Sequence, residues 1–160
     1  MEETKPEASS KAAQANRVIR YHAIGAAAVG LVPAPLIDLA LIAGIQLNLV
    51  RSLAKLYEMP FSEEIGKSLI SALLGASVPG TAFSLMKFVP VIGMVGASAA
   101  GAASTYAVGK VFVQHFESGG SFLTFDPDRV REHYAREMKS GVAKATGMAE
   151  DEEDWGGIKP

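Results

Sequence analysis

The sequence predicts an all-α protein built from two proline-cornered apolar helical hairpins and a C-terminal amphipathic helix. Three observations support this prediction. The β-branched residues lie inside helix-length apolar runs, without the alternation that marks a half-buried strand. Prolines separate these runs, and proline ends helices because it lacks an amide donor and clashes with the preceding turn. The last long segment is polar on most of its surface but carries an apolar stripe.

Composition narrows the classes of function. The chain has 160 residues, a formal net charge of -2 and no cysteine. A missing cysteine excludes disulfides, thiolate metal sites and a cysteine nucleophile. The near-neutral charge gives no field that would select nucleic acid, so no nucleic-acid partner is expected. His22, His115 and His133 lack metal-site spacing, and no phosphate-loop or nucleophile-elbow motif occurs. We therefore expect no enzyme activity, no metal and no cofactor.

The N-terminal part predicts a short disordered lead followed by a long helix. Residues 1–9 are polar and rich in acids, which is typical of disorder. The helix is expected to start at Ser9 or Ser10 and to run to about Val32. Pro33 then stops it.

The second and third helices are predicted from their end signals. Pro35 suits the first position of a helix that continues to about Tyr57, where Met59-Pro60 breaks it. Ser62 is the expected N-cap of the next helix, because serine accepts a hydrogen bond from the first-turn amides. That helix is predicted to end near Ser77.

The second half repeats this scheme weakly. Pro79-Gly80 predicts a turn, residues 81–87 a short helix, and Pro90 to Phe116 a long helix that ends at the glycines of ESGGS. Asp126-Pro127 is a strong helix start, with aspartate as cap and proline at the first position. The predicted organisation is a lead (1–9), a helical domain (10–121), a C-terminal helix (122–147) and an acidic disordered tail (148–160). The docking stripe of the C-terminal helix is Val130, Tyr134, Met138 and Val142.

The apolar runs leave the relation to a membrane open. Residues 88–109 are uncharged and meet the length of about 20 residues that a spanning helix needs, whereas 68–86 are interrupted at Pro79-Gly80. Residues 21–37 and 39–50 are shorter, and they read as the arms of a hairpin that enters a bilayer from one side. Basic residues at both open ends of this hairpin suit a cytoplasmic face: Arg17, Arg20, Arg51 and Lys55. A spanning protein, a re-entrant one and a soluble bundle remain alternatives.

Small residues recur every four positions along the longest helix. The row consists of Gly93, Ala97, Gly101, Thr105 and Gly109. Small residues at this spacing form a shallow groove in which another helix backbone can approach closely. The row predicts helix packing, either within the chain or between copies in a homo-oligomer.

Two polar residues stand out in the second helix. Asp38 lies in its first turn, where a carboxylate complements the helix dipole, and the alternative is a functional aspartate that faces a partner. Gln46 lies in an apolar stretch, where a hydrogen bond to a neighbouring helix is the expected role.

These motifs together resemble a known family. The pattern Pro33-x-Pro35-x-x-Asp38, followed by Gln46 and a helix ending Leu56-Tyr57, resembles the bacterial domain-of-unknown-function family 697, the YcjF-like helical domain. The stretch KFVPVIG, which contains Pro90 and Gly93, is similar to the second half of that family. Gly109-Lys110 and the ESGG segment belong to the same half. The resemblance covers roughly residues 18–121 and assigns no chemistry to these residues.

The resemblance implies a GTPase-associated membrane module. Members of the family often carry an Era-like GTPase domain, and the absence of a phosphate loop here implies a separate GTPase as partner. The expected function is a non-enzymatic module that contacts membrane lipid and anchors or responds to that GTPase, and the alternative is a soluble self-assembling helical scaffold. The expected location is the bacterial cytoplasmic membrane with cytoplasmic termini, and the alternative is the cytoplasm. Glu58 departs from the family pattern, which has glycine after the tyrosine.

Overall fold

The computed structural model describes residues 4–31, 35–77 and 90–147, and these ranges contain helices and no strand. The all-α fold class is therefore confirmed. The helices are α1 (Thr4–Val29), α2 (Pro35–Leu56), α3 (Glu63–Ser77), α5 (Pro90–Glu117) and α6 (Pro127–Gly147). The predicted turn at Pro79-Gly80, the short helix 81–87, Pro33 and the acidic tail lie outside the described residues.

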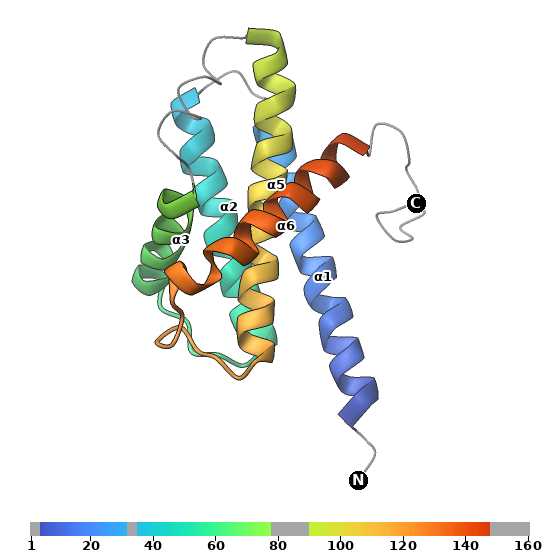
Figure 1. The fold of residues 1–160 in the computed structure, drawn as a ribbon, viewed down its shortest axis with the longest axis vertical. Helices are drawn as coiled ribbons and strands as arrows, with labels where there is room; N and C mark the ends of the chain where they lie inside the picture. Colours follow the sequence, from blue (N-terminus) through green and yellow to red (C-terminus); the bar gives the residue numbers. More distant parts are fainter. Residues whose placement is uncertain (1–3, 32–34, 78–89, 148–160) are drawn as a thin grey trace.

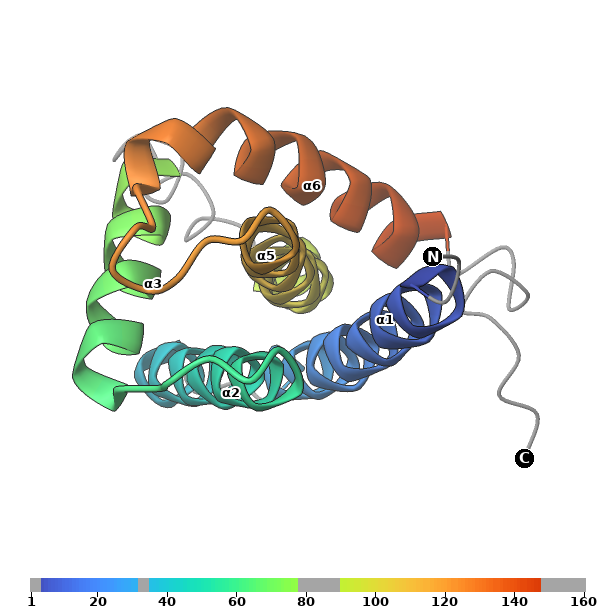
Figure 2. The same ribbon diagram turned by 90° about the horizontal axis from the view of Figure 1, so that it is seen from below.

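Helix α5 stands at the centre of the fold. Viewed nearly along its axis, it is surrounded by α1 and α2 on one side, α3 on another and α6 on a third (Figure 2). Its residues are small and apolar on nearly every face from Gly96 to Gly109. A helix that is apolar all round is typically buried. The composition of α5 thus explains its central place.

Helices α1 and α2 are in contact, but the predicted arrangement of two hairpins is not confirmed. Helices α1 and α2 pack against each other, and both pack against α5 (Figure 1). The described part of α3 packs against α2 and α6 instead of forming a hairpin with α5. The physical reason is that α1, α2 and α6 already contact the narrow surface of α5, so α3 covers an outer position.

Helix α1 begins earlier than the sequence predicted. It starts at Thr4, so the prediction of a disordered lead over residues 1–9 is wrong from Thr4 onward. Pro6 is compatible with this start, because the amide groups of a helix's first turn have no intrahelical acceptor in any case. Glu7 lies close to the positive end of the helix dipole, which favours a carboxylate.

The loop before α6 forms an aromatic core with the last turns of α5. The rings of Phe112 and Phe125 stack with centroids 4.5 Å apart, and those of Phe116 and Phe122 meet edge to face at 5.3 Å. The predicted cap is confirmed, because Oδ1 of Asp126 accepts a hydrogen bond from the Asp128 amide at 3.0 Å.

The docking stripe of α6 is confirmed for three of its four residues. Tyr134 is buried, and Val130 and Met138 pack against the core. Val142 is 38% exposed, so its expected docking is wrong. The buried residue of that turn is Gly141, whose Cα lies so close to α5 that an added Cβ would be 2.8 Å from the Cα of Ala103. Close helix contact at this turn requires the glycine.

Helix α2 ends in a left-handed residue, Glu58, at the position where the resemblance implies glycine. Glu58 has a φ of 58°, and the Met59 amide donates to the Ala54 carbonyl at 2.8 Å. The Glu58 amide donates to the Lys55 carbonyl at 3.3 Å. These two hydrogen bonds form a Schellman motif, in which the left-handed residue is usually glycine. For a residue with a Cβ, this left-handed conformation is unfavourable by roughly 1–2 kcal/mol.

We expect Glu58→Gly to stabilise the fold. The relief of left-handed strain exceeds the roughly 0.4–1 kcal/mol of extra unfolded-state entropy that glycine brings, so the net gain is about 0.5–1 kcal/mol. Urea unfolding followed by circular dichroism measures it. Glu58→Ala serves as the control, since it keeps the Cβ and should give no such gain. A loss of stability in Glu58→Gly would contradict the assigned backbone strain.

Candidate functional site

The motif residues gather at one end of the molecule. Pro35 begins α2, and Asp38 lies in its first turn. Pro90 begins α5, and Gly93 lies in its first turn. The start of α2, the start of α5 and the end of α1 lie at the same end of the bundle, which we call the corner end (Figure 1). The side chains of these four residues lie outside the described part of the structure, so the role predicted for Asp38 stays a prediction.

The described members of the small-residue row face α1. A Cβ added to Gly101 would be 3.3 Å from the Ala26 carbonyl oxygen, and one added to Gly109 would be 2.6 Å from Cγ1 of Ile19. Thr105, which lies between them, is fully buried. Gly101, Thr105 and Gly109 therefore serve packing within the chain. The side chain of Ala97 lies outside the described residues, and the homo-oligomer stays a prediction.

Gln46 anchors a buried polar network across three helices. Its Nε2 donates to Oγ of Ser104 on α5 at 2.9 Å, and that hydroxyl lies 3.1 Å from the Tyr134 hydroxyl on α6. Burial raises the pKa of Tyr134, whereas the bond with Ser104 opposes the shift. This is the hydrogen bond to a neighbouring helix that the sequence led us to expect. The network ties α2, α5 and α6 together by pairing the Gln46 Nε2 group, whereas Oε1 of Gln46 is buried and has no hydrogen-bond partner among the described residues.

The outward face of α1 changes character along its length. Towards the N-terminus it carries exposed polar residues, ending with Arg17. Towards the corner end it carries Tyr21, Ile24 and Leu31, which are 60%, 49% and 53% exposed, together with Ala28. These residues follow a spacing of three and four, so they lie on one side of the helix.

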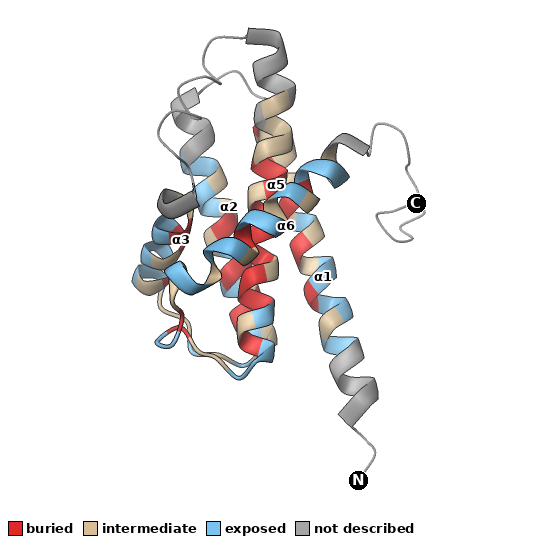
Figure 3. Ribbon diagram, viewed as in Figure 1, coloured by how far each residue is buried: buried red, intermediate tan, exposed pale blue. Residues whose placement is uncertain are grey.

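The outward face of α2 shows the same change in polarity; the exposed residues of the described part of α2 are pale blue in Figure 3. Nearest the corner end it exposes Leu41, at 46%, and Gly44, with Ala40 and Ala43 beside them. Nothing lies within 4 Å of the position that a Cβ on Gly44 would occupy. Further along, the exposed residues are Asn48, Arg51 and Lys55. Both arms of the hairpin are thus apolar near the corner and basic away from it.

We call this exposed apolar surface the hairpin face. It comprises Tyr21, Ile24 and Ala28 of α1, Leu31 just after the end of α1, and Ala40, Leu41, Ala43 and Gly44 of α2. From Tyr21 to Ala28 it extends about 10 Å along the helix at 1.5 Å per residue. Exposed apolar patches rimmed by charge mark contact sites for proteins or membranes. The sequence showed the basic open ends, but it did not show which apolar residues face outward.

The described residues were also compared with the requirements of a metal site and of a membrane-spanning helix. No group of three or more His, Cys, Asp or Glu side chains among them is arranged to hold a metal ion. Across the described helices, none combines the length and apolar character needed to cross a bilayer. His115 and His133, which are distant in sequence, line one groove between α5 and α6.

The fold and its motif residues define a helical domain of one family. The sequence model described as "Domain of unknown function (DUF697)" matches residues 7–140, and this chain belongs to that family. A similar relative is "Magnetosome membrane protein 22" of Magnetospirillum gryphiswaldense, with 35% identity over 149 residues. The alignment covers 88% of this chain and 76% of the relative. No solved structure matches.

Proposed function

We propose that this chain is a non-enzymatic membrane-associated module whose α1–α2 hairpin inserts its corner end into one leaflet of the bilayer. The observation that carries the proposal is the parallel change on both arms from exposed basic to exposed apolar residues. The hairpin face would enter the acyl boundary, while Arg17, one turn before Tyr21, would meet anionic headgroups. Tyr21 lies at the transition, the level at which tyrosine is enriched in membrane proteins.

The free energies expected for insertion favour reversible, lipid-dependent binding. Full burial of a large apolar side chain contributes about 1.5–3 kcal/mol, so each half-exposed residue of the hairpin face has about 1 kcal/mol left to gain. Tyr21, Ile24, Leu31 and Leu41 together then contribute about 4 kcal/mol. Each basic residue near an anionic surface adds about 1 kcal/mol. The membrane protein among the relatives supports the same function.

The finer proposal is that the anchored module holds a separate Era-like GTPase at the membrane. Its support is the family to which the chain belongs. Cross-linking of the chain in its native membranes, followed by mass spectrometry, tests this partner. Enrichment of a GTPase agrees with the proposal. Recovery of copies of this chain alone would favour the self-assembling scaffold.

A pair of leucine substitutions tests membrane insertion. We expect Leu41→Glu to reduce binding to anionic vesicles about tenfold or more, because a carboxylate replaces a side chain that enters the acyl boundary. Leu123→Glu is the matched control, since Leu123 is 87% exposed in the loop at the far end of α5. Vesicle flotation measures both variants.

Two results would overturn the proposal. If Leu41→Glu and Leu123→Glu float as well as the unaltered chain, the hairpin face does not enter the membrane. If no form of the chain floats with anionic vesicles, the soluble scaffold becomes the better account. Far-ultraviolet circular dichroism confirms that each variant is folded.

A further inference from the structure

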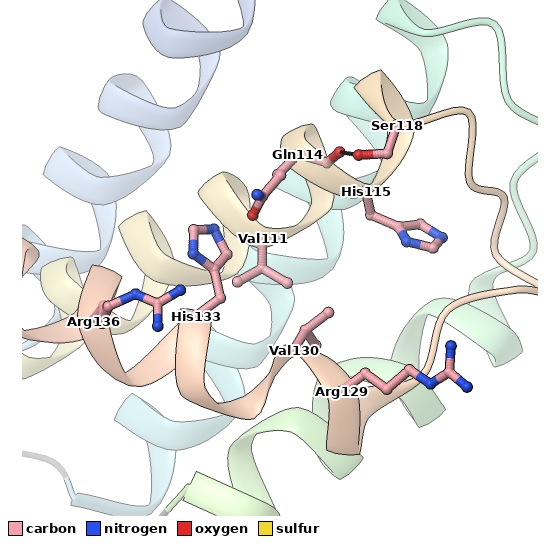
Figure 4. A pocket seen from close by; sticks show the side chains of 8 residues that line it. All are labelled: Val111, Gln114, His115, Ser118, Arg129, Val130, His133 and Arg136. Atoms are coloured by element: carbon pink, nitrogen blue, oxygen red, sulfur yellow. Dashed lines mark hydrogen bonds between the residues drawn. The ribbon is translucent and has the colours of Figure 1, made fainter.

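A groove between α5 and α6 carries positive charge without a carboxylate in its wall. It has a volume of about 270 Å³ and lies between the last two turns of α5 and the first half of α6. The polar residues in its wall are Gln114, His115, Ser118, Arg129, His133 and Arg136. Figure 4 shows Gln114 of α5 and His133 of α6 extending towards each other, with Arg136 beside His133 and Arg129 at the other end.

The two arginines in the groove wall, Arg129 and Arg136, have guanidinium N–H donors left for a ligand. Arg129 contacts Asp126 through Nε at 3.3 Å, which leaves its terminal nitrogens for another acceptor, and its side chain is 87% exposed. Arg136 has no ion pair with any residue of the described ranges. Arginine presents a planar fork of donors that matches the oxygens of a phosphate group. Arg136 lies beside the imidazole of His133, whereas Arg129 lies at the other end of the groove (Figure 4).

His133 lies among charges of both signs. Burial is the main cause of its lowered pKa, Glu137 opposes this shift from 3.9 Å, and the charges of Arg136 and Lys110 lower the pKa further. Arg129 and His115 line the same groove. A bound anion would act on the imidazole in the same direction as Glu137 and favour its charged form.

His115 and Ser118 shape the wall of the groove. Nε2 of His115 lies 2.9 Å from the Ser121 carbonyl, and its ring packs edge to face on Phe125 at 5.0 Å. The Ser118 hydroxyl donates to the Gln114 carbonyl at 2.7 Å. Both groups are already bonded within the protein. The remaining donors are those of Arg129, His133, Arg136 and the Gln114 amide.

We propose that this groove binds the phosphate group of a small soluble ligand through Arg129, His133 and Arg136. A volume of about 270 Å³ lies just below the roughly 300–1,000 Å³ of drug-sized ligand sites, which suits a compact anion. Lipid headgroups carry the same chemistry. The choice of a soluble source rests on the proposed membrane insertion. Val111 in the groove wall lies roughly 30 Å along α5 from Pro90 at the corner end. With the corner end in the bilayer, the groove would therefore lie away from the lipid headgroups.

The test is a titration of the full chain with inorganic phosphate and with pyrophosphate, at constant ionic strength set by chloride. The ring signals of the three histidines are followed by NMR. We expect saturable shifts of the His133 signals and a rise in its pKa, since an anion favours the imidazolium form. Arg136→Gln should weaken binding about tenfold, as expected for the loss of a charge-assisted bond.

Arg131→Gln is the matched control. It removes the same charge from the same helix, but Arg131 pairs with Asp128 outside the groove wall. Equal weakening in both variants, or no saturable shift in the unaltered chain, would overturn the proposal.

Vesicles of phosphatidylglycerol form the second arm of the experiment. If they shift the His133 signals while phosphate and pyrophosphate do not, the soluble source is wrong. Flotation of Arg136→Gln with vesicles reports on membrane insertion separately.

Discussion

Gly101→Leu is expected to destabilise the fold by about 1–3 kcal/mol, the usual cost of overpacking a close helix contact. A Cβ at this position would already lie 3.2 Å from Cδ1 of Ile42 and 3.3 Å from the backbone oxygen of Ala26. The Ile42 side chain can move, but the Ala26 backbone cannot do so without displacing α1. Thermal unfolding followed by circular dichroism in mild detergent measures the effect.

Ala99→Leu on the same helix is the control. Ala99 is partly exposed and lies about 160° around the helix from Gly101, at 100° per residue, so it points away from α1. A smaller loss of stability is expected there. Equal tolerance of both leucines would mean that Gly101 is not part of a packing contact. Size-exclusion chromatography of both variants tests the homo-oligomer, which should survive Gly101→Leu if the row packs only within the chain.

Gly141→Ala is expected to destabilise the fold, although alanine normally favours a helix over glycine by about 1 kcal/mol. The added Cβ would lie 2.8 Å from the Cα of Ala103 and 3.1 Å from its Cβ. Because the obstruction is backbone, α6 must move away from α5. We expect a net loss of about 1–2 kcal/mol, at the lower end of overpacking costs.

Gly44→Ala is the same substitution at an exposed position, and its effect on stability should have the opposite sign. Gly44 lies inside α2, is exposed, and would place its Cβ in open space. This variant should be more stable by roughly 0.5–1 kcal/mol. Urea unfolding of both variants gives the comparison. Stabilisation of both would show that α6 does not approach α5 closely at Gly141.

Local signals allowed the helix ends to be predicted from the sequence. Pro35, Pro90 and the Asp126-Pro127 pair each begin or cap a helix as expected, because these residues act on the backbone of their own turn. The N-terminal boundary was wrong, since polar residues in a first turn read equally well as a disordered lead. Family membership was predicted from the Pro33-x-Pro35-x-x-Asp38 motif and the stretch around Pro90 and Gly93, and it is confirmed.

The arrangement of the helices was less predictable. The second hairpin was inferred from a weak repeat of the charged ends and proline corner of the first. It is not confirmed, because the described part of α3 packs against α2 and α6. Gly141 was missed because the search on α6 followed large apolar residues, although its place seven residues after Tyr134 puts it on the same stripe. The hairpin face was missed because the apolar pattern of α1 and α2 does not by itself show which side of each helix faces α5.

Environment-sensitive fluorophores on single cysteines test membrane insertion most directly. The chain has no cysteine of its own, so Ile24→Cys, Leu41→Cys and Leu123→Cys each give one labelling site. With anionic vesicles, our account predicts blue-shifted, brighter emission from the labels at Ile24 and Leu41 and unchanged emission at Leu123. Unchanged emission at all three positions, or a shift at Leu123 alone, would contradict insertion of the hairpin face.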